Sequence, residues 1–381
     1  MQIEEFNEKT GKLIMAPSAS YYTFEPFPLP IKFVYDAELV NNLSQAIMSL
    51  GNLSGAGRWL KNPYLLISPY LNKEAVLSSK IEGTRTSLSE VFLHEKEPKR
   101  TTEGDLLEVM NYIKALHYGL TQIKTNKITE QLIKEMHKIL IHGARGEFKS
   151  PGQYKTQPNW IGSTLDPNEA RFVPAHPNSV PRLMVNLIYY LNEFDNTHPL
   201  IKVALMHYQF ETIHPFRDGN GRLGRMLIIL YLCSIGVLTQ PLLYLSAYFE
   251  KFKDQYNERL YAVSAKGDVN GWLNFFFKGV KVQADDAVNR SLKLQEYLEK
   301  SRLLLQNKTN SSNTLIVLDQ LFTNPYITLP EAKKLLKTKN LSTPKNVIDI
   351  LVKNSILKEI TGRKRNRIFI APIINKILEG S

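Results

Sequence analysis

Twelve residues between two apolar segments, HPFRDGNGRLGR from His214 to Arg225, combine side chains suited to acting on a phosphate group. Gly219 and Gly221 let the backbone turn tightly and bring its N–H groups against an anion. A helix that follows them points its positive end at the same place. Arg222 and Arg225 lie three residues apart on nearly one helix face and can fork onto phosphate oxygens. The run is therefore predicted to form an anion-binding loop.

Two more side chains could allow this loop to catalyse a reaction on the bound phosphate. An unperturbed imidazole titrates near neutral pH, so His214 is expected to be able to take a proton from a hydroxyl. Asp218 offers a carboxylate where Mg²⁺ binds through a few carboxylates and substrate phosphates. A zinc site of His207, His214 and Asp218 is the alternative, but it leaves the arginines and glycines unexplained. The joint pattern favours phosphoryl-group chemistry over a helix–loop–helix with solvated arginines.

The run resembles the Fic-domain motif HPFx[DE]GNGRxxR at every fixed position. The resemblance implies that His214 deprotonates a hydroxyl of a target protein, which attacks the α-phosphorus of ATP and expels pyrophosphate. It also implies that Phe216 anchors the loop, Asp218 binds Mg²⁺ and Arg225 receives the γ-phosphate. Because relatives that act as kinases depart from GNGR, the sequence implies AMP transfer. The residues that the resemblance assigns to ATP are Glu82, His214, Gly219, Asn220, Gly221, Arg222, Leu223, Gly224, Arg225 and Asn257.

Two segments extend the resemblance beyond the loop. The runs GEFKSPGQYKTQPNWIG and ARFVPAHP resemble the family's flap, a β-hairpin that docks the target by strand addition. Lys155 stands there in a place usually held by arginine, and VPAHP replaces a polyproline run. The run YLSAYFEKFKDQYNERL resembles the adenine-side helix, in which Asn257 replaces a common tyrosine. The residues expected to dock the target are Trp160, Ile161, Gly162, Phe172 and Val173.

An inhibitory motif is expected upstream of the loop. SSKIEG resembles the family's [ST]xxxE[GN] pattern, which Ser78, Glu82 and Gly83 satisfy. The resemblance implies that Glu82 pairs with Arg225 and removes the partner of the γ-phosphate, so that ATP binds unproductively. Without the motif, Glu82 would be interpreted as a solvated residue at a helix end. A second alternative is that Glu82 positions a water that removes AMP from a modified protein.

Composition limits the class of protein. The 381 residues are 43% hydrophobic and 22% charged, an ordinary globular balance that argues against disorder or a fibre. The first residues lack a secretory signal, so we expect a cytoplasmic protein. The most apolar run, Met226 to Leu238, is shorter than the roughly 20 residues that span a bilayer, so it is expected to be a buried helix and no membrane partner is expected. Cys233 is the only cysteine, which excludes an intrachain disulfide.

Periodicity predicts a mainly α fold, preceded by an extended, proline-rich segment to about Lys32. A hairpin-like loop is expected between His142 and Val180, and a linker from Gln306 to Ser312. The resulting domains are an N-terminal helical region with the inhibitory motif (1–100), a Fic-type helical core with a β-hairpin flap (101–305) and a C-terminal winged-helix domain (313–381). The expected helices are Asp36–Leu50, Ser68–Lys80, Leu106–Ile123, Thr129–Ile141, Arg182–Phe194, Leu200–Thr212, Ser246–Lys266, Val269–Lys300, Leu315–Phe322, Leu329–Lys337 and Thr343–Lys353.

The C-terminal segment carries most of the excess positive charge. From Ser311 to Ser381 there are twelve Lys or Arg against five Asp or Glu, in a chain whose net charge is +12. Three short helices followed by the basic turn GRKRN predict a winged helix, which can contact DNA, although such modules also dock proteins or form dimers. The chain is thus expected to act on a target protein, or on itself, with ATP and Mg²⁺. The alternative is a protein that is not primarily an enzyme, namely a DNA-binding regulator whose Fic core only senses nucleotide. Both hypotheses are compatible with a homodimer.

Overall fold

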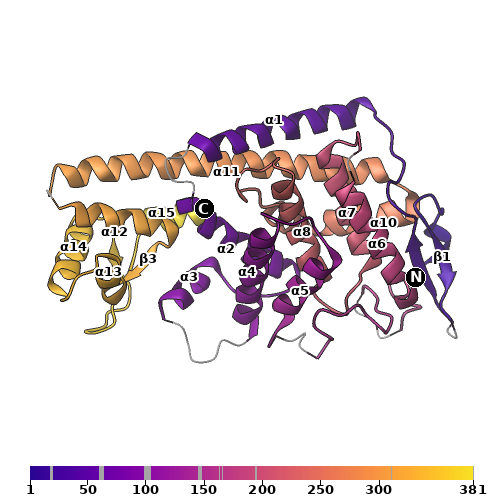
Figure 1. Cartoon of the computed structure of the whole chain (residues 1–381), viewed down its shortest axis with the longest axis horizontal. Helices are drawn as coiled ribbons and strands as arrows, with labels where there is room; N and C mark the ends of the chain where they lie inside the picture. The colour runs from indigo at the N-terminus through magenta and orange to yellow at the C-terminus, as the bar shows by residue number, and fades with distance from the viewer. Residues whose placement is uncertain are drawn as a thin grey trace.

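The computed structural model describes residues 1–17, 20–59, 64–97, 104–144, 148–162, 164, 166–193, 195–309 and 311–380, without the side chains of 56–59 and 64–66. The fold is mainly α, as expected (Figure 1). Two long helices, α1 (Ala37–Trp59) and α11 (Val269–Gln306), lie side by side along one edge and cover the shorter helices. None of the described helices is long and apolar enough to span a membrane.

The helices that position the loop form the centre of the molecule. α7 (Pro199–Ile213) leads into the HPFRDGNGRLGR run, and α8 (Asn220–Ser234) leaves it. Both are buried nearly all round, which confirms the buried helix expected from the apolar run. Around them pack α2 (Tyr64–Ile81), α4 (Gly104–Gln122) and α5 (Glu130–Ile141). Thr129 caps α5 as expected, because its side chain accepts a hydrogen bond from the Leu132 N–H at 3.1 Å.

The N-terminal segment is a β-hairpin, where the sequence predicted only an extended stretch. After the short η1 (Ile3–Glu5), β1 (Gly11–Met15) pairs antiparallel with β2 (Tyr22–Pro26). The ring of Phe24 is fully buried and contacts that of Phe172 at 5.7 Å between centroids. Proline richness alone did not reveal this pairing, because it depends on an aromatic partner far along the chain.

Several helix boundaries differ from those expected. α11 runs to Gln306 rather than Lys300, and the next helix begins at Ser312, so the two helices meet the predicted linker at its two end residues. The helix expected over Ser246–Lys266 is two helices, α9 (Ser246–Lys251) and α10 (Lys253–Lys266), separated by Phe252 at φ −116° and ψ 41°. The prediction also missed α3 (Leu88–Lys96), which has a capping box between Ser87 and Glu90. The remaining helices of the core are η2 (Pro177–Ser179) and α6 (Val180–Asn192). Phe194, the predicted end of the latter, lies outside the described residues.

The C-terminal segment is a small module of helices around an antiparallel sheet. Its strand order is β3-β5-β4, so the first strand pairs with the last. Three helices and a hairpin occur in the order that the sequence indicated, while β3 and the last helix were not predicted. Assignment to the winged-helix class and the three domain boundaries stay predictions. The elements are α12 (Ser312–Thr323), β3 (Tyr326–Thr328), α13 (Leu329–Leu335), α14 (Ser342–Lys353), β4 (Lys358–Glu359), β5 (Ile368–Ile370) and α15 (Pro372–Glu379).

This module docks on the two helices that flank the inhibitory motif. α12 packs on α2, and β3 packs on α3. Lys73 of α2 donates to the carbonyls of Leu378 and Glu379 at 3.1 Å, where the negative end of α15 favours a cation. Asn324 donates to the Glu95 carboxylate of α3 at 2.6 Å. The module is therefore attached to the body by specific polar contacts as well as by apolar packing.

Candidate active site

His214 lies at the C-cap of α7 in the left-handed region, with φ 50° and ψ 60°. Its Nδ1 lies 3.2 Å from the carbonyl oxygen of Glu211. A carbonyl oxygen only accepts, so this contact fixes the proton on Nδ1 and leaves Nε2 as the unprotonated nitrogen. Burial, helped by the charge of Lys155, lowers the pKa of His214 to about 4. The residue is therefore neutral at pH 7, with one nitrogen ready to accept a proton.

Phe216 fixes the middle of the loop in the core. Its ring is fully buried and stacks on His137 at 3.8 Å between centroids and 12° between planes. Asn220 closes the turn, since its side chain accepts from the Phe216 N–H at 2.9 Å and donates to the Phe216 carbonyl at 2.8 Å. Gly219 lies at φ 78°, where residues with a side chain are strained. The amide of Asn220 thus holds the loop itself, a role that the resemblance did not assign.

Asp218 stands at the rim of the loop, half-exposed. Lys149 donates to its carboxylate at 2.8 Å, and the Asp218 carbonyl lies 3.0 Å from Nε2 of His137. Burial raises the pKa of Asp218, but the hydrogen bond from Lys149 and the charges of Arg222 and Lys149 outweigh it and hold the pKa below its ordinary value. An ionised carboxylate at this position fits a magnesium ion that takes its other ligands from phosphates and water. Lys149 would have to move aside for it.

The two arginines have different partners. Arg222 is buried, and its Nη1 donates to the Glu108 carboxylate of α4 at 2.8 Å. Arg225 is also buried, and its Nε donates to the Ser78 hydroxyl at 2.8 Å. A second nitrogen of Arg225, Nη2, donates to the Ser78 carbonyl at 3.0 Å. Both guanidinium groups are therefore held in place by residues of neighbouring helices.

Glu82 completes the environment of Arg225, as the inhibitory motif predicted. Its Oε1 accepts from Nη2 at 2.6 Å, while the carboxylate keeps 39% of its surface exposed. Burial raises the pKa of Glu82, but the charge of Arg225 outweighs it and holds the pKa below its ordinary value. Gly83, at φ 98°, ends the turn after α2. Gly221 is needed beside this pair, because a Cβ there would lie 2.4 Å from Oε1 of Glu82.

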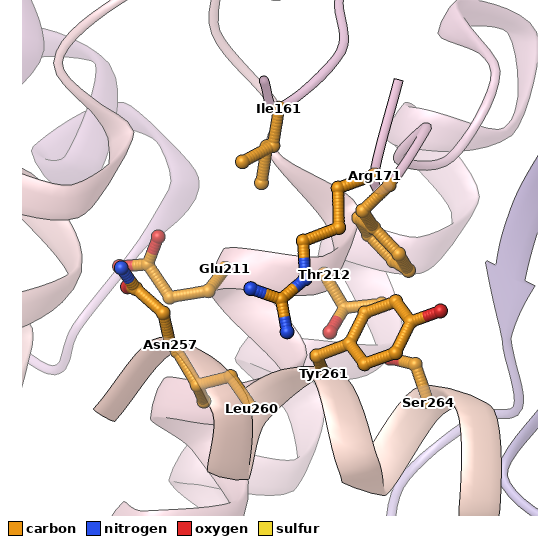
Figure 2. A pocket seen from close by; sticks show the side chains of 9 residues that line it. Ile161, Arg171, Glu211, Thr212, Asn257, Leu260, Tyr261 and Ser264 are labelled. Carbon is orange, nitrogen blue, oxygen red and sulfur yellow. The ribbon is translucent and has the colours of Figure 1, made fainter. Parts of the chain in front are cut away.

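A cavity of about 130 Å³ opens beside the loop, between the flap and α10 (Figure 2). Ile161 and Phe172 line it from the flap, and Asn257 and Tyr261 from α10. The Arg171 guanidinium lies 4.9 Å from the centre of the Tyr261 ring and pairs with Glu258. The wall is apolar with a few polar groups, a lining that suits the base and sugar of a nucleotide.

The flap is a short hairpin with one occupied edge. Ile161 and Phe172 pair through both backbone bonds, at 2.8 and 3.4 Å. The carbonyl of Val173 accepts from the Phe24 N–H of β2 at 2.8 Å, so the N-terminal hairpin covers that side. Trp160 donates from its indole to the Thr164 carbonyl at 2.8 Å, and Gly162 lies at φ 144°. The strand edge near Ile161 is the one expected to receive a target segment.

Sequence reasoning missed two functional candidates, Glu108 and Glu211, and marked a third, Lys155, only as a replacement for arginine. Lys155 is buried under the loop, where its Nζ donates to Asn159 at 2.8 Å, and burial lowers the pKa of Lys155 to about 7. Glu108 orients Arg222 from α4. Glu211 lines the cavity with one buried oxygen that has no hydrogen-bond partner among the described residues, and burial raises the pKa of Glu211 to about 8 against the charge of Arg225. Of these residues, only Glu211 lies close to His214 in the sequence. Its spacing along the helix is therefore the one pattern that could have identified a candidate.

The structure brings the loop, the inhibitory motif and the cavity together, but it does not form the alternative zinc site. His207 lies about two turns before His214 on α7, where it is fully buried and its Nε2 contacts the Tyr256 hydroxyl at 2.7 Å. No cluster of three groups able to hold a metal occurs in the part of the chain that the structure describes. The loop with its flanking helices therefore places two fixed arginines and a helix N-terminus beside a neutral histidine, an arrangement that suits an anion.

Comparison with known proteins names the family. Residues 127–232 match the Fic/DOC family, and residues 40–121 match the N-terminal region of the same family. The chain thus contains a Fic/DOC domain with its N-terminal region. A Fic family protein from Desulfovibrio desulfuricans G20 has a similar fold, with a TM-score of 0.58 over 89% of this chain and 97% of that chain at 18% identity.

Curated relatives resemble only part of the chain. A probable protein adenylyltransferase of Aquifex aeolicus is 32% identical over 176 residues, which are 44% of this chain and 50% of the relative. The protein adenylyltransferase fic-1 of Caenorhabditis elegans is 27% identical over 126 residues, 32% of this chain and 23% of the relative. The chain therefore spans half or less of the length of these relatives.

Proposed function

We propose that this protein transfers AMP from ATP to a Ser, Thr or Tyr hydroxyl of a target protein, with His214 as the general base. The observation that carries the proposal is the 3.2 Å contact between Nδ1 of His214 and the Glu211 carbonyl, because it leaves Nε2 unprotonated beside the anion-binding loop. Relatives named as protein adenylyltransferases support the same reaction. The target protein is unidentified, and the protein itself is one candidate.

In this reaction the hydroxyl proton moves to Nε2 of His214 as the hydroxyl oxygen attacks the α-phosphorus of ATP. A new P–O bond to the target forms, the bond between the α-phosphorus and the bridging oxygen breaks, and pyrophosphate leaves. The loop N–H groups from Gly219 to Gly224, with Arg222 and Arg225, would bind the phosphates. Asp218 would hold Mg²⁺, which neutralises phosphate charge when it is bound. The cavity with Asn257 would take the adenosine.

We further propose that Glu82 inhibits the enzyme. Arg225, to which the resemblance assigns the γ-phosphate, already bonds to the Glu82 carboxylate at 2.6 Å. A triphosphate would have to displace that carboxylate or bind without the arginine, in a pose unsuited to attack. Because Glu82 is partly exposed, it can leave without unfolding α2.

Transfer of label from α-labelled ATP tests these roles together. We expect weak labelling of protein by the wild type, strong labelling by Glu82→Gly, and a loss of about 100-fold or more in Glu82→Gly/His214→Ala. His137→Ala could not replace His214→Ala in this test, because the His137 ring supports the loop. Equal labelling by the single and double variants would reject His214 as the base, and silence of all three would reject AMP transfer.

Removal of AMP from a modified protein is a second candidate, favoured by the exposed, ionised carboxylate of Glu82. A carboxylate in that state can orient a water for attack. Release of AMP from an adenylylated protein by the wild type, and its loss in Glu82→Gly, would support this reaction. A cytoplasmic location and a homodimer stay predictions, which fractionation and light scattering can test.

A further inference from the structure

The C-terminal module docks on the body mainly through one side. α12, β3 and α15 contact the body through α2, α3 and α11. α13 and α14 lie at the end of the molecule farthest from the N-terminal hairpin (Figure 1). α13 also bonds to α3, through Glu331 and Lys96 at 2.9 Å, whereas α14 packs on α12 and α13, which belong to the module itself.

α14 is amphipathic, with one apolar face and one polar face. Its inner face buries Val347, Ile348 and Leu351, while its outer face exposes Lys345 and Lys353. Three other polar residues on the outer face, Ser342, Asn346 and Asp349, are also exposed. The helix has 12 residues, or about 18 Å at about 1.5 Å per residue. It follows α13 after a short turn, which is the arrangement of a helix–turn–helix.

The hairpin between β4 and β5 adds a second basic element. Its tip exposes Arg363, Lys364 and Arg365. The Glu359 carboxylate accepts from the Thr361 and Gly362 N–H groups at 2.8 and 3.0 Å, so the tip begins from an ordered turn. β5 pairs with β3 and β4, which fixes the hairpin to the sheet of the module.

Most of these cations have no protein partner. Arg363 is the exception, because it pairs at 2.9 Å with Glu97, the residue that follows α3. Within the described part of the chain, Lys345, Lys353, Lys364 and Arg365 form no ion pair. Cations that are exposed and unpaired are available to phosphates, and they cost little to bring to a polyanion because their charges remain in water.

We propose that this face, formed by α14 and the β4–β5 hairpin, binds duplex DNA. α14 would enter the major groove, which is about 12 Å wide and admits one helix. The hairpin tip would contact the adjacent phosphate backbone with Lys364 and Arg365. The acidic Asp349 repels phosphate but can accept from a base edge such as the cytosine amino group. Its place on α14 between two lysines thus suits a groove-facing helix better than a general anion-binding surface.

Fluorescence anisotropy of the full-length protein with a labelled duplex of about 20 base pairs tests the proposal. No ATP is added, so the result does not depend on AMP transfer. With about four phosphate contacts, affinity should fall by about 100-fold between roughly 50 and 200 mM salt. Lys364→Ala/Arg365→Ala should weaken binding and reduce the salt slope by about 2. Lys345→Ala/Asn346→Ala should also weaken it.

The matched control is Lys124→Ala/Lys127→Ala, which removes two exposed cations far along the chain from the module. This variant should bind DNA as the wild type does. Since all these side chains are exposed, unchanged thermal midpoints should show that each variant folds. The proposal is overturned by absence of binding at about 50 mM salt, by an equal loss in the control, or by equally tight binding of an acidic polypeptide.

Discussion

The anion-binding loop and the C-terminal module both carry several arginines or lysines, but they hold them in opposite ways. In the loop, Arg222 and Arg225 are buried, and each bonds to a carboxylate at 2.8 Å or less. In the module, Lys364 and Arg365 are exposed on a hairpin tip. Buried charges must be paired because leaving water is costly, whereas exposed charges need no partner.

The difference separates two ways of binding phosphate. A buried, fixed guanidinium is already oriented, so it can place one phosphate group with the accuracy that a reaction needs. It can also be blocked by a single competing carboxylate, as Glu82 is proposed to do. Exposed cations give affinity that depends on their number and on salt. The comparison therefore predicts that equivalent substitutions change stability and binding strongly in the loop and only weakly in the module.

The largest effect is expected from removing the aromatic anchor of the loop. Phe216→Ala would leave a cavity beside His137, and we expect it to lower the free energy of unfolding by about 3–5 kcal/mol. The control in the module is Val352→Ala, a partly exposed position of α14, with an expected loss of about 0.5 kcal/mol. Denaturant unfolding measures both. Similar losses in the two variants would show that the loop is not the more tightly packed region.

A second test breaks the buried ion pair of the loop. Glu108→Gln removes the charge that faces Arg222 but keeps an acceptor of similar shape, so we expect a loss of about 2–3 kcal/mol in unfolding free energy. Affinity for ATP should fall in the same variant, because Arg222 is no longer oriented. Calorimetry in the Glu82→Gly background measures the affinity. Unchanged stability would mean that Arg222 finds another partner.

The sequence was most informative where local chemistry decides the structure. The HPFRDGNGRLGR run identified the loop. The contact of Glu82 with Arg225 was foreseen only through the resemblance of SSKIEG to the family's inhibitory motif. The burial of α8 followed from its uninterrupted apolar residues. In these cases the residue types themselves carry the constraint, such as positive φ at Gly219 or the need to bury Phe216.

What the sequence did not reveal depends on partners far along the chain. β1 and β2 needed the flap and the ring of Phe172 to be recognised as a hairpin. Glu108 and Lys155 reach the loop from separate segments, and no spacing connects them to it. The break between α9 and α10 at Phe252 has no proline or glycine beside it to mark it. Tertiary contacts set these features, so periodicity could not predict them.

A third test uses the pH dependence of stability. Burial raises the pKa of Glu211 to about 8, above the ordinary value of 4.5. Between these values the folded protein keeps a proton that the unfolded chain releases, so this residue makes stability fall as pH rises. Glu211→Gln removes the effect, and the stability of the variant relative to the wild type should rise by roughly 1 kcal/mol per pH unit between about pH 5 and 7.5. A difference that does not change with pH would show that the carboxyl is ionised in the folded protein.

The smallest effect is expected where the two regions can be compared most directly. Glu97→Gln breaks the ion pair with Arg363 by the same chemical change as Glu108→Gln, but both partners are about half-exposed. We expect a loss of at most about 1 kcal/mol, which should shrink further as salt is added. Denaturant unfolding at low and high salt measures it. A loss as large as that of Glu108→Gln would mean that the hairpin tip helps to hold α3, and that its charges are structural rather than available to a ligand.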